Sequence, residues 1–554
     1  MTQLPAAMSP EELDRLPRAV ADFPLIRARG QIYVDKTDLI HQLAATRDKY
    51  FLSRPRRFGK SLLLSTFEAL FHDGLRDFGG LKIEELWHER RTWPVLRLDF
   101  SLASVFASRE EFLDAAENMV LDQAVTRAGL MLPPPRHGHD HAFHRFGRLL
   151  AAAAADSLVL LIDEYDAPLN SCLERPELFT AVRDVLRDFY LSLKANARAL
   201  RFMFFTGIVR YRHTGIFSGF NIYEDLTLNP RYATLLGYTQ AEICRYFEPY
   251  LTHAAAVLGL SVDGCLDGLR EHYDGFCFDR LASATVFAPW SVLNFFKNPE
   301  LGYINYWYDS AGRPELLIGY LRERLRRGDR LPGEGAELSL ADLNSARETG
   351  GLSAEALLTQ AGYLTIKAVD QRSGMARVNF PNRELTESMR TLYADVLFSA
   401  QDRHLISDLR RTFLEDSPQE IIAWLNDALF ACADYLHYAF TGENAVRTTL
   451  QMCLAAAGLS PVIERHSARG RSDLEVTAGT RHFVMEFKYL KASGGGDEQR
   501  EEERGQALLE QAAAQLQERR YGLPPPAGTQ AVRMALVFSE RQRGFTHTRV
   551  LTEA

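Results

Sequence analysis

The sequence is poor in cysteine. Its 554 residues include six cysteines, and no two of them form a CxxC pair. Such spacing argues against a disulfide framework and against a zinc ribbon, and it favours a reducing compartment. We therefore expect a cytoplasmic protein.

Apolar runs long enough to cross a membrane are also missing. The longest run, LLAAAAADSLVLLI, carries Asp156 in its middle and falls short of the roughly 20 residues that a spanning helix needs. The first residues, MTQLPAAMSPEELDRLP, lack a positive segment followed by an apolar one, so we expect no signal peptide. The sequence predicts no membrane partner.

Net charge gives little guidance. A formal charge of −8 provides no global reason to expect nucleic-acid binding. Because net charge averages over domains, a local basic groove is still compatible with it. The length predicts about three domains, and changes in texture place them at residues 1–230, 231–400 and 401–554.

The first region alternates short apolar runs with helical stretches, which predicts an α/β domain with a mostly parallel sheet. The expected strands are residues 49–54, 93–101, 157–163 and 200–208. The second region is mainly helical, with aromatic segments that we expect to be buried by packing. The third has a helix–strand–strand–helix pattern, interrupted by the exposed loop KASGGGDEQREEERG.

The stretch FLSRPRRFGKSLLLSTF combines a strand, a loop, Gly-Lys-Ser and an amphipathic helix, as in a Walker A motif. The first Walker glycine is missing, because Arg54 stands at its position. An arginine is tolerated there if φ is negative, since only positive φ demands glycine. We expect a nucleotide, ATP, to be bound by the loop and first helical turn: Arg57, Phe58, Gly59, Lys60, Ser61 and Leu62.

The run SLVLLIDEYDAPL predicts the second half of the nucleotide site. It is a buried strand that delivers Asp163 and Glu164 to its carboxyl end. We expect Asp163 and Ser61 to hold Mg²⁺ and Glu164 to polarise the attacking water. The next strand ends near Thr206 and Arg210; Thr206 is a candidate γ-phosphate sensor and Arg210 a weaker phosphate contact.

The segment GRSDLEVTAGTRHFVMEFKYL predicts a hairpin with a turn at residues 477–480. Strand residues two apart share a face, so Asp473, Glu486 and Lys488 converge on one side. Two carboxylates suit Mg²⁺ or Mn²⁺, and a lysine can orient water or stabilise developing charge during phosphodiester cleavage. We expect Glu475 and Glu464, which are alternative ligands, to be surface charges. An ordinary exposed amphipathic hairpin is the competing interpretation.

A family resemblance covers residues from about 20 to 545. It is carried by YVDKTDLI, by the Walker-like stretches, and by GIFSGFNIYEDLTLNPRYATLLGYT, YDGF, NYWY, TQAGYLTI and NFPNRE. In combination these resemble the AAA-ATPase-like family, whose members typically carry a C-terminal PD-(D/E)XK nuclease-like domain. The resemblance implies that the Ser-Arg-Pro-Arg-Arg run is normal at this loop. It also implies that Glu443 is a further metal or supporting carboxylate and that Gln515 occupies a family glutamine position.

Together these observations predict an AAA/STAND-like P-loop ATPase joined through a helical middle region to a metal-dependent nuclease. Its expected cofactors are ATP and Mg²⁺, with Mn²⁺ as a second metal for the nuclease, and its expected partner is nucleic acid, with DNA as the first candidate. A role in defence or mobile-element control is one hypothesis, and a homo-oligomer is left open. The alternative is an ATP-dependent switch or scaffold whose nuclease-like domain binds nucleic acid or protein without cleaving.

Overall fold

The computed structural model describes residues 8–552, except for 137–139, 174, 211–221, 311–316, 323–335, 344–352, 399–401, 431–439, 464–465, 468–469 and 493–497. The chain forms two compact units. The first unit comprises Met1–Gly312 and Glu334–Thr386, and the second comprises Arg313–Gly333 and Glu387–Ala554. The three domain boundaries expected from texture stay a prediction.

The first unit is built on a five-stranded parallel sheet in the order β2-β3-β4-β1-β5. The strands are β1 (Lys49–Ser53), β2 (Val95–Asp99), β3 (Leu158–Asp163), β4 (Leu200–Gly207) and β5 (Glu224–Asp225). The four expected strands and the α/β fold class are thus confirmed. Because β4 lies between β1 and β3, the carboxyl ends of all three meet at one edge of the sheet.

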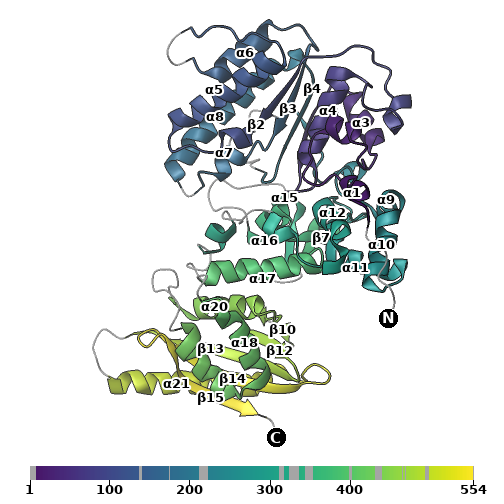
Figure 1. Ribbon diagram of the computed structural model, residues 1–554. Coiled ribbons are helices and arrows are strands. Elements are labelled where there is room, and N and C mark those ends of the chain that lie inside the picture. Colours follow the sequence, from purple (N-terminus) through teal and green to yellow (C-terminus); the bar gives the residue numbers. More distant parts are fainter. Residues whose placement is uncertain are drawn as a thin grey trace. The chain divides into compact units, whose positions relative to one another are not determined.

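Apolar residues on both faces explain why these strands are central. Every residue of β3 and β4 is buried, as a parallel sheet covered on both sides requires. Figure 1 shows α3 and α4 on one side of this sheet and α5, α6 and α8 on the other. The helices are α1 (Pro10–Asp14), α2 (Phe23–Ala28), α3 (Thr37–Ala44), α4 (Lys60–Asp73), α5 (Arg109–Leu121), α6 (Ala142–Ala152), α7 (Ala167–Asn170) and α8 (Pro176–Ala195).

Most of the middle region belongs to the first unit, and it is mainly helical. Its elements are α9 (Gln240–Tyr246), α10 (Glu248–Leu258), α11 (Val262–Tyr273), α12 (Pro289–Lys297), α13 (Trp307–Ser310), α15 (Leu340–Leu343), α16 (Ala354–Ala361) and a small sheet of β6 (Ala336–Ser339), β7 (Thr365–Asp370) and β8 (Met375–Asn379). The buried aromatic cores of these helices confirm that the aromatic segments serve packing.

Three of the sequence motifs meet inside this middle region. The Asn382 amide donates to the Asp274 carbonyl over 2.6 Å, which joins NFPNRE to YDGF. The buried Glu384 carboxylate accepts from the backbone of Tyr306 and Trp307, at 2.8 and 3.0 Å. Buried acceptors need such partners, so these motif residues hold the middle region together.

The second unit contains a five-stranded mixed sheet in the order β15-β14-β13-β12-β9. Its strands are β9 (Val462–Ile463), β12 (Leu474–Ala478), β13 (Arg481–Leu490), β14 (Gln530–Ser539) and β15 (Gly544–Thr552), and a short hairpin pairs β10 (His466–Ser467) with β11 (Gly470–Arg471). Its helices include α18 (His404–Glu415), α19 (Pro418–Trp424), α20 (Glu443–Ala456) and α21 (Glu498–Arg519), and α17 (Arg383–Leu397) enters the second unit at Glu387. The helix–strand–strand–helix pattern predicted for this region omits β14 and β15.

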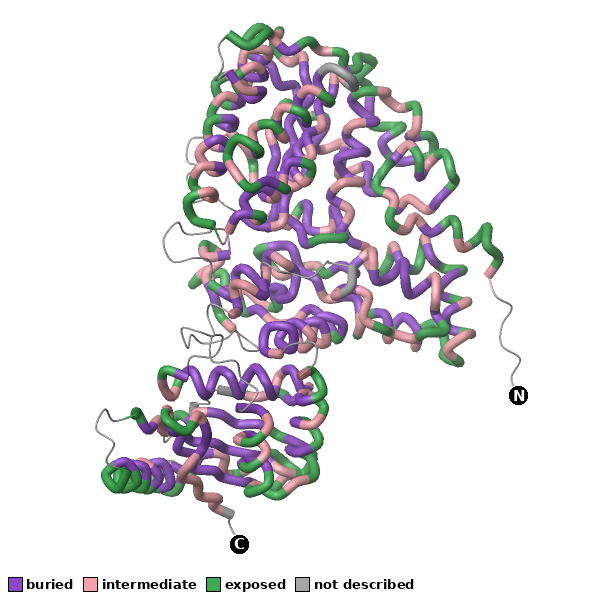
Figure 2. The backbone as a smooth tube through the Cα atoms, turned by 60° about the vertical axis from the view of Figure 1, so that its left-hand side comes forward, coloured by how far each residue is buried: buried purple, intermediate pink, exposed green. Residues whose placement is uncertain are grey.

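The sheet of the second unit is buried on both faces. Residues of α21 pack with Val484 and Val537 on one face, while Phe413 of α18 contacts Phe483 on the other. Strand β14 is almost wholly buried (Figure 2) because it lies between β13 and β15. The parallel pairing of β13 with β14 requires a crossover, and α21 supplies it.

Two absences hold for the part of the chain that is described. No helix within it is long and apolar enough to cross a membrane. The cysteines at positions 172, 244, 265, 277 and 453 are free thiols, and Cys432 lies outside the described residues.

Candidate nucleotide and nuclease sites

The loop between β1 and α4 has the backbone of a phosphate-binding loop. Gly59 begins α4 in the left-handed conformation, with φ of 92°, and Arg57 is also left-handed, with φ of 65°. A Cβ on Gly59 would meet one atom, at 4.0 Å, so glycine is required here by conformation rather than by space. The N-terminus of α4, which is partly buried, offers backbone N–H groups and the positive end of the helix to an anion.

Lys60 is buried at the start of α4. Its ammonium group donates to the carbonyls of Arg54 and Pro55, each over 3.0 Å. Burial lowers the pKa of Lys60, and the carboxylates of Asp163 and Glu164 oppose that shift. The lysine is therefore held within the loop by two weak acceptors that a phosphate can replace.

Asp163 and Glu164 lie at the carboxyl end of β3, facing the first turn of α4. The Ser61 hydroxyl hydrogen-bonds the Asp163 carboxylate, and this bond partly offsets the rise in the pKa of Asp163 that burial causes. Burial also raises the pKa of Glu164, while Lys60 lowers it. A hydroxyl and a buried carboxylate in contact are hard oxygen donors, which fit Mg²⁺.

Two further residues at this site were missed by the sequence analysis. Arg97 of β2 lies 3.8 Å from the Asp163 carboxylate and donates to the Ser61 carbonyl over 3.2 Å. The buried Asp166 accepts from the backbone N–H of Val209 over 2.7 Å, which ties the end of β3 to the end of β4. The signal for Arg97 was a charge within the otherwise apolar strand VLRLD.

Thr206 and Arg210 lie at the same sheet edge but are engaged by protein groups. The Thr206 hydroxyl donates to the Leu52 carbonyl over 2.8 Å inside the sheet. The Arg210 guanidinium pairs with Asp225, and its backbone N–H donates to Gln360 over 3.0 Å. Their roles as a sensor and a phosphate contact stay predictions.

Arg54, at the position of the missing glycine, is a buried structural residue. It is 1% exposed and donates to the carbonyls of Ser53 at 2.8 Å, Thr227 at 2.9 Å and Tyr232 at 3.3 Å. Its guanidinium also lies 4.3 Å from the ring centre of Phe278. Arg54 is not among the residues with positive φ, which confirms that glycine is dispensable at this position.

The phosphate loop is anchored to the middle region by its apolar residues. The buried Phe58 ring contacts Phe276 and Phe278 with ring centres 4.9 and 5.1 Å apart. A Cβ on Gly362 would lie 2.7 Å from Pro55, so this glycine lets α16 approach the loop closely. Leu62, in the first turn of α4, is half-buried.

The hairpin of the second unit brings the predicted nuclease residues together. Strands β12 and β13 pair with Leu474 opposite Met485 and Val476 opposite Phe483. Asp473 directly precedes β12, and its carboxylate accepts from the backbone N–H of Phe487 over 2.9 Å. The predicted hairpin is confirmed, although the turn is tighter than expected because β12 continues to Ala478.

Glu486 is the most perturbed acid of this site. It is 1% exposed; one carboxylate oxygen accepts from Lys488 over 3.2 Å, while the other is buried and has no hydrogen-bond partner among the described residues. Burial, followed by repulsion from Asp473, raises the pKa of Glu486 to about 7. A buried, unsatisfied carboxylate oxygen is costly unless a proton or a cation compensates it.

Helix α20 places one acidic and one basic residue next to Asp473 and Lys488. The Glu443 carboxylate at its start lies 4.0 Å from Lys488, and burial raises its pKa. Arg447, one turn later, lies 3.7 Å from the Asp473 carboxylate and was missed by the sequence analysis. Among the described residues, no three His, Cys, Asp or Glu side chains are arranged to hold a metal ion. The roles of Asp473, Glu486 and Glu443 as metal ligands therefore stay predictions.

The expectation that Glu475 is a surface charge is wrong. Glu475 is 4% exposed, accepts from the Ser472 hydroxyl over 2.8 Å and lies 3.3 Å from a ring nitrogen of His482. It is buried because it shares a face with its cross-strand partner Val484, and α21 and Tyr521 pack on that face. Glu464 lies outside the described residues, and Gln515 is half-buried on α21.

Comparisons with known proteins match both sites. Residues 17–217 match the family described as "Predicted AAA-ATPase", and residues 441–547 match the PD-(D/E)XK nuclease superfamily. A protein of Azotobacter chroococcum mcd 1, described as an uncharacterized protein in the vnfD 5′ region, is 30% identical over 495 residues. The alignment covers 86% of this chain and 90% of that relative.

The chain belongs to the AAA-ATPase-like family and carries a C-terminal PD-(D/E)XK domain. The two matched segments contain the phosphate loop with Asp163 in one case and Asp473, Glu486 and Lys488 in the other. Membership of these families supports an ATPase-type and a nuclease-type activity. The AAA-ATPase-like match ends at residue 217, before most of the middle region that anchors the loop.

Proposed function

We propose that this AAA-ATPase-like protein binds and hydrolyses ATP with Mg²⁺ and that its PD-(D/E)XK domain cleaves nucleic acid, DNA first among the candidates, with Mg²⁺ or Mn²⁺. The single observation that carries the nuclease half is the unsatisfied, buried oxygen of Glu486 beside Asp473 and Lys488. The two family matches do not support a role in defence or mobile-element control.

At the nucleotide site, each side chain has a distinct part. When ATP binds, the Lys60 ammonium group would donate to phosphate oxygens in place of the two loop carbonyls and would neutralise part of the phosphate charge. Gly59 lets the backbone approach the phosphates closely. Ser61 and Asp163 would hold the magnesium ion, and Arg97 and Asp166 keep Asp163 in position. Glu164 would accept a proton from the attacking water, a role that its raised pKa favours.

At the nuclease site, Asp473 and Glu486 would hold the metal ion, with Glu443 as a supporting carboxylate. A bound Mg²⁺ or Mn²⁺ supplies positive charge that offsets the negative charge developing on the phosphate during hydrolysis. Lys488 donates to Glu486 and can donate to the attacking water or to a phosphate oxygen. Arg447 holds the Asp473 carboxylate toward β13.

Replacing Lys60 by alanine is expected to weaken ATP binding by at least about 10-fold. The substitution removes the positive charge that offsets the β- and γ-phosphates, and its loss should cost at least about 10-fold in affinity. Binding of a fluorescent ATP analogue, with and without Mg²⁺, checks this. Lys82, a lysine on the surface of the same unit, gives the control Lys82→Ala, which should bind like the wild type.

Replacing Lys488 by alanine is expected to abolish cleavage while leaving nucleic-acid binding measurable. The test is cleavage of end-labelled single- and double-stranded DNA and RNA with Mg²⁺ or Mn²⁺, with and without ATP. Cleavage by the wild type that Lys488→Ala lacks supports the nuclease, and its change in Lys60→Ala would link the two activities. Binding without cleavage on every substrate would favour the alternative, a nucleotide-dependent switch or scaffold.

A further inference from the structure

The acids of the nuclease site create a problem for a polyanionic substrate. The Glu486 and Glu443 carboxylates lie 3.2 and 4.0 Å from Lys488, and the Asp473 carboxylate accepts from the backbone N–H of Phe487, the residue after Glu486. These carboxylates repel the phosphates of a nucleic-acid strand, so binding is favoured when positive charge beside the site adds to that of a bound metal ion. The net charge of the whole chain, −8, does not supply it, so the compensating charge must be local.

An arginine cluster borders the site on the side of β12. The Tyr521 hydroxyl accepts from the backbone N–H of Arg471 and from the guanidinium of Arg519, each over 3.1 Å. Arg471 is exposed and precedes Asp473 by two residues, or about 7 Å of extended chain. Arg520 follows Arg519 and is exposed as well. We call Arg471, Arg519 and Arg520 the arginine rim.

The rim lies on the same face of the sheet as Glu486. Tyr521 is buried in the cluster that α21 forms with Val484, and a Cβ on Gly522 would lie 2.2 Å from the Val484 side chain. Val484 and Glu486 are two residues apart on one strand and therefore share a face. The chain around Tyr521 is thus fixed next to the carboxylates.

The hydroxyl hydrogen of Tyr521 is a hydrogen-bond donor without a partner among the described residues. Its oxygen accepts two hydrogen bonds, but the hydroxyl hydrogen has no acceptor among the described residues, although the residue is 1% exposed. A phenolic hydroxyl can donate one hydrogen bond. An anionic oxygen placed against Arg519 would accept it, and a phosphate supplies such an oxygen.

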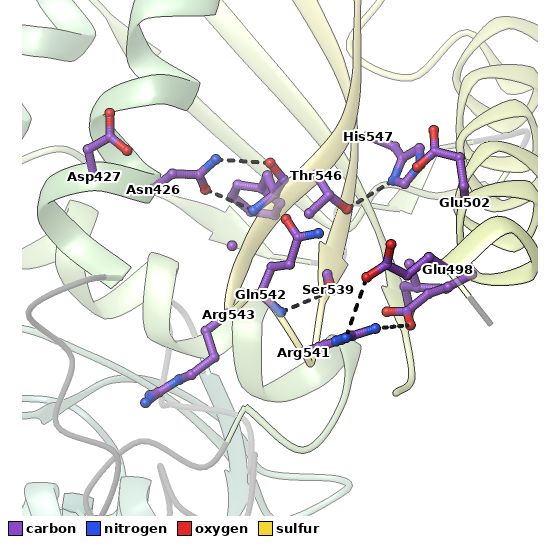
Figure 3. A pocket seen from close by; sticks show the side chains of 14 residues that line it. Asn426, Asp427, Glu498, Glu502, Ser539, Arg541, Gln542, Arg543, Thr546 and His547 are labelled. Atoms are coloured by element: carbon purple, nitrogen blue, oxygen red, sulfur yellow. Dashed lines mark hydrogen bonds and ion pairs between the residues drawn. The ribbon is translucent and has the colours of Figure 1, made fainter. Parts of the chain in front are cut away.

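Two other exposed arginines of the second unit are paired with glutamates of α21. Arg549 donates to Glu510 over 2.8 Å, and Arg541 lies 3.5 Å from Glu501. Figure 3 shows Arg541 in a cavity of about 890 Å³, with its guanidinium directed at the glutamates of α21. By contrast, Arg519 and Arg520 form no ion pair with any described residue.

We infer that the arginine rim binds backbone phosphates of the nucleic acid next to the cleavage site, with Tyr521 holding Arg471 and Arg519 in register. The inference rests on the proposed nuclease function. It makes the rim a positioning surface that is indifferent to base sequence, because phosphates carry no sequence information. Arg519 in the last turn of α21 also has a simpler explanation, a favourable interaction with the negative helix end, which the experiment must separate.

The test is the salt dependence of binding in the full chain. A fluorescein-labelled 30-nucleotide DNA, single-stranded or duplex, is titrated in EDTA at several salt concentrations, and binding is followed by anisotropy. The double variant Arg519→Gln with Arg520→Gln is expected to bind about 10-fold more weakly. The slope of log K against log salt should become shallower by about 1.4 for single strands or 1.8 for duplex, as two lost phosphate contacts require.

A matched double variant tests whether the loss of any two positive charges from the second unit has the same effect as the loss of the rim arginines. Arg541→Gln with Arg549→Gln removes the same charge from arginines that are already paired, and it should keep the wild-type slope. Tyr521→Phe should weaken binding although all three rim arginines are still present. If Arg519→Gln with Arg520→Gln unfolds the domain, Arg519→Lys with Arg520→Lys replaces it. This second double variant keeps both positive charges and should keep the wild-type slope of log K against log salt.

Equal slopes in the two double variants would overturn the inference, whatever the cleavage assay shows. Failure of the proposed function is distinguishable from this result. A wild type that binds but cleaves no substrate contradicts the nuclease, while a shallower slope in the rim variant would still establish the rim as a phosphate-binding surface.

Discussion

Restoring the Walker consensus with Arg54→Gly is expected to weaken ATP binding by more than about 10-fold and to destabilise the first unit by about 3 kcal/mol or more. The guanidinium donates to carbonyls of Ser53, Thr227 and Tyr232. Glycine would leave the carbonyls of Thr227 and Tyr232 without these donors and open a cavity under the loop. The phosphate loop would then lose its link to the segment that follows β5.

The measurements are thermal unfolding of the first unit and titration with a fluorescent ATP analogue. Arg57→Gly is the matched control for stability on the same loop. Arg57 is exposed and left-handed, so glycine relieves about 1 kcal/mol of backbone strain there and offsets the loss of its contact with Trp290. This control should unfold like the wild type, and Lys82→Ala serves as the control for ATP binding. Tighter ATP binding by Arg54→Gly at an unchanged melting temperature would contradict the structural role.

Local patterns predicted those parts of the fold that depend on neighbours in sequence. The four strands of the first sheet are apolar runs with polar ends, and the β12–β13 hairpin follows from the alternation around Asp473 and Glu486. The alternation of apolar and charged residues also predicted that these acids lie on one face of the hairpin, because the side chains of a strand repeat every two residues. Strand β14 (Gln530–Ser539) is an equally clear apolar run, and the helix–strand–strand–helix pattern overlooked it.

Partners distant in sequence explain what the sequence analysis missed. Arg54 is understandable only from Thr227 and Tyr232, which lie 173 and 178 residues away. Arg97 reaches Asp163 because β2 and β3 are adjacent in the sheet, and no local signal gives strand order. Glu475 is buried because α21 and Tyr521 cover the face of the sheet that it shares with Val484. The charge of a side chain predicts exposure only until a neighbouring element supplies a partner.

Replacing Glu486 by glutamine is expected to abolish cleavage and, at the same time, to stabilise the second unit at high pH. The pKa of Glu486 is raised to about 7 in the folded protein, whereas an unfolded glutamate titrates near about 4.3. The folded state therefore binds the proton more tightly, so stability is greatest below the unfolded pKa and falls as pH rises through about 7. Glutamine mimics the protonated acid and avoids this loss, at the cost of a metal ligand.

The expected gain in the free energy of unfolding is about 3 kcal/mol at pH 8 and under about 1 kcal/mol at pH 5. Thermal unfolding in EDTA at both pH values measures it, with Glu510→Gln on the exposed surface of α21 as the control. Mg²⁺ should stabilise the wild type at pH 8 and leave Glu486→Gln unchanged, because the ion compensates the same buried charge. Cleavage by the wild type should likewise increase with pH, with a midpoint that falls as Mg²⁺ is raised. A variant that is less stable than the wild type at pH 8 would show that Lys488 already compensates Glu486, and the argument for a metal ion at this carboxylate would fail.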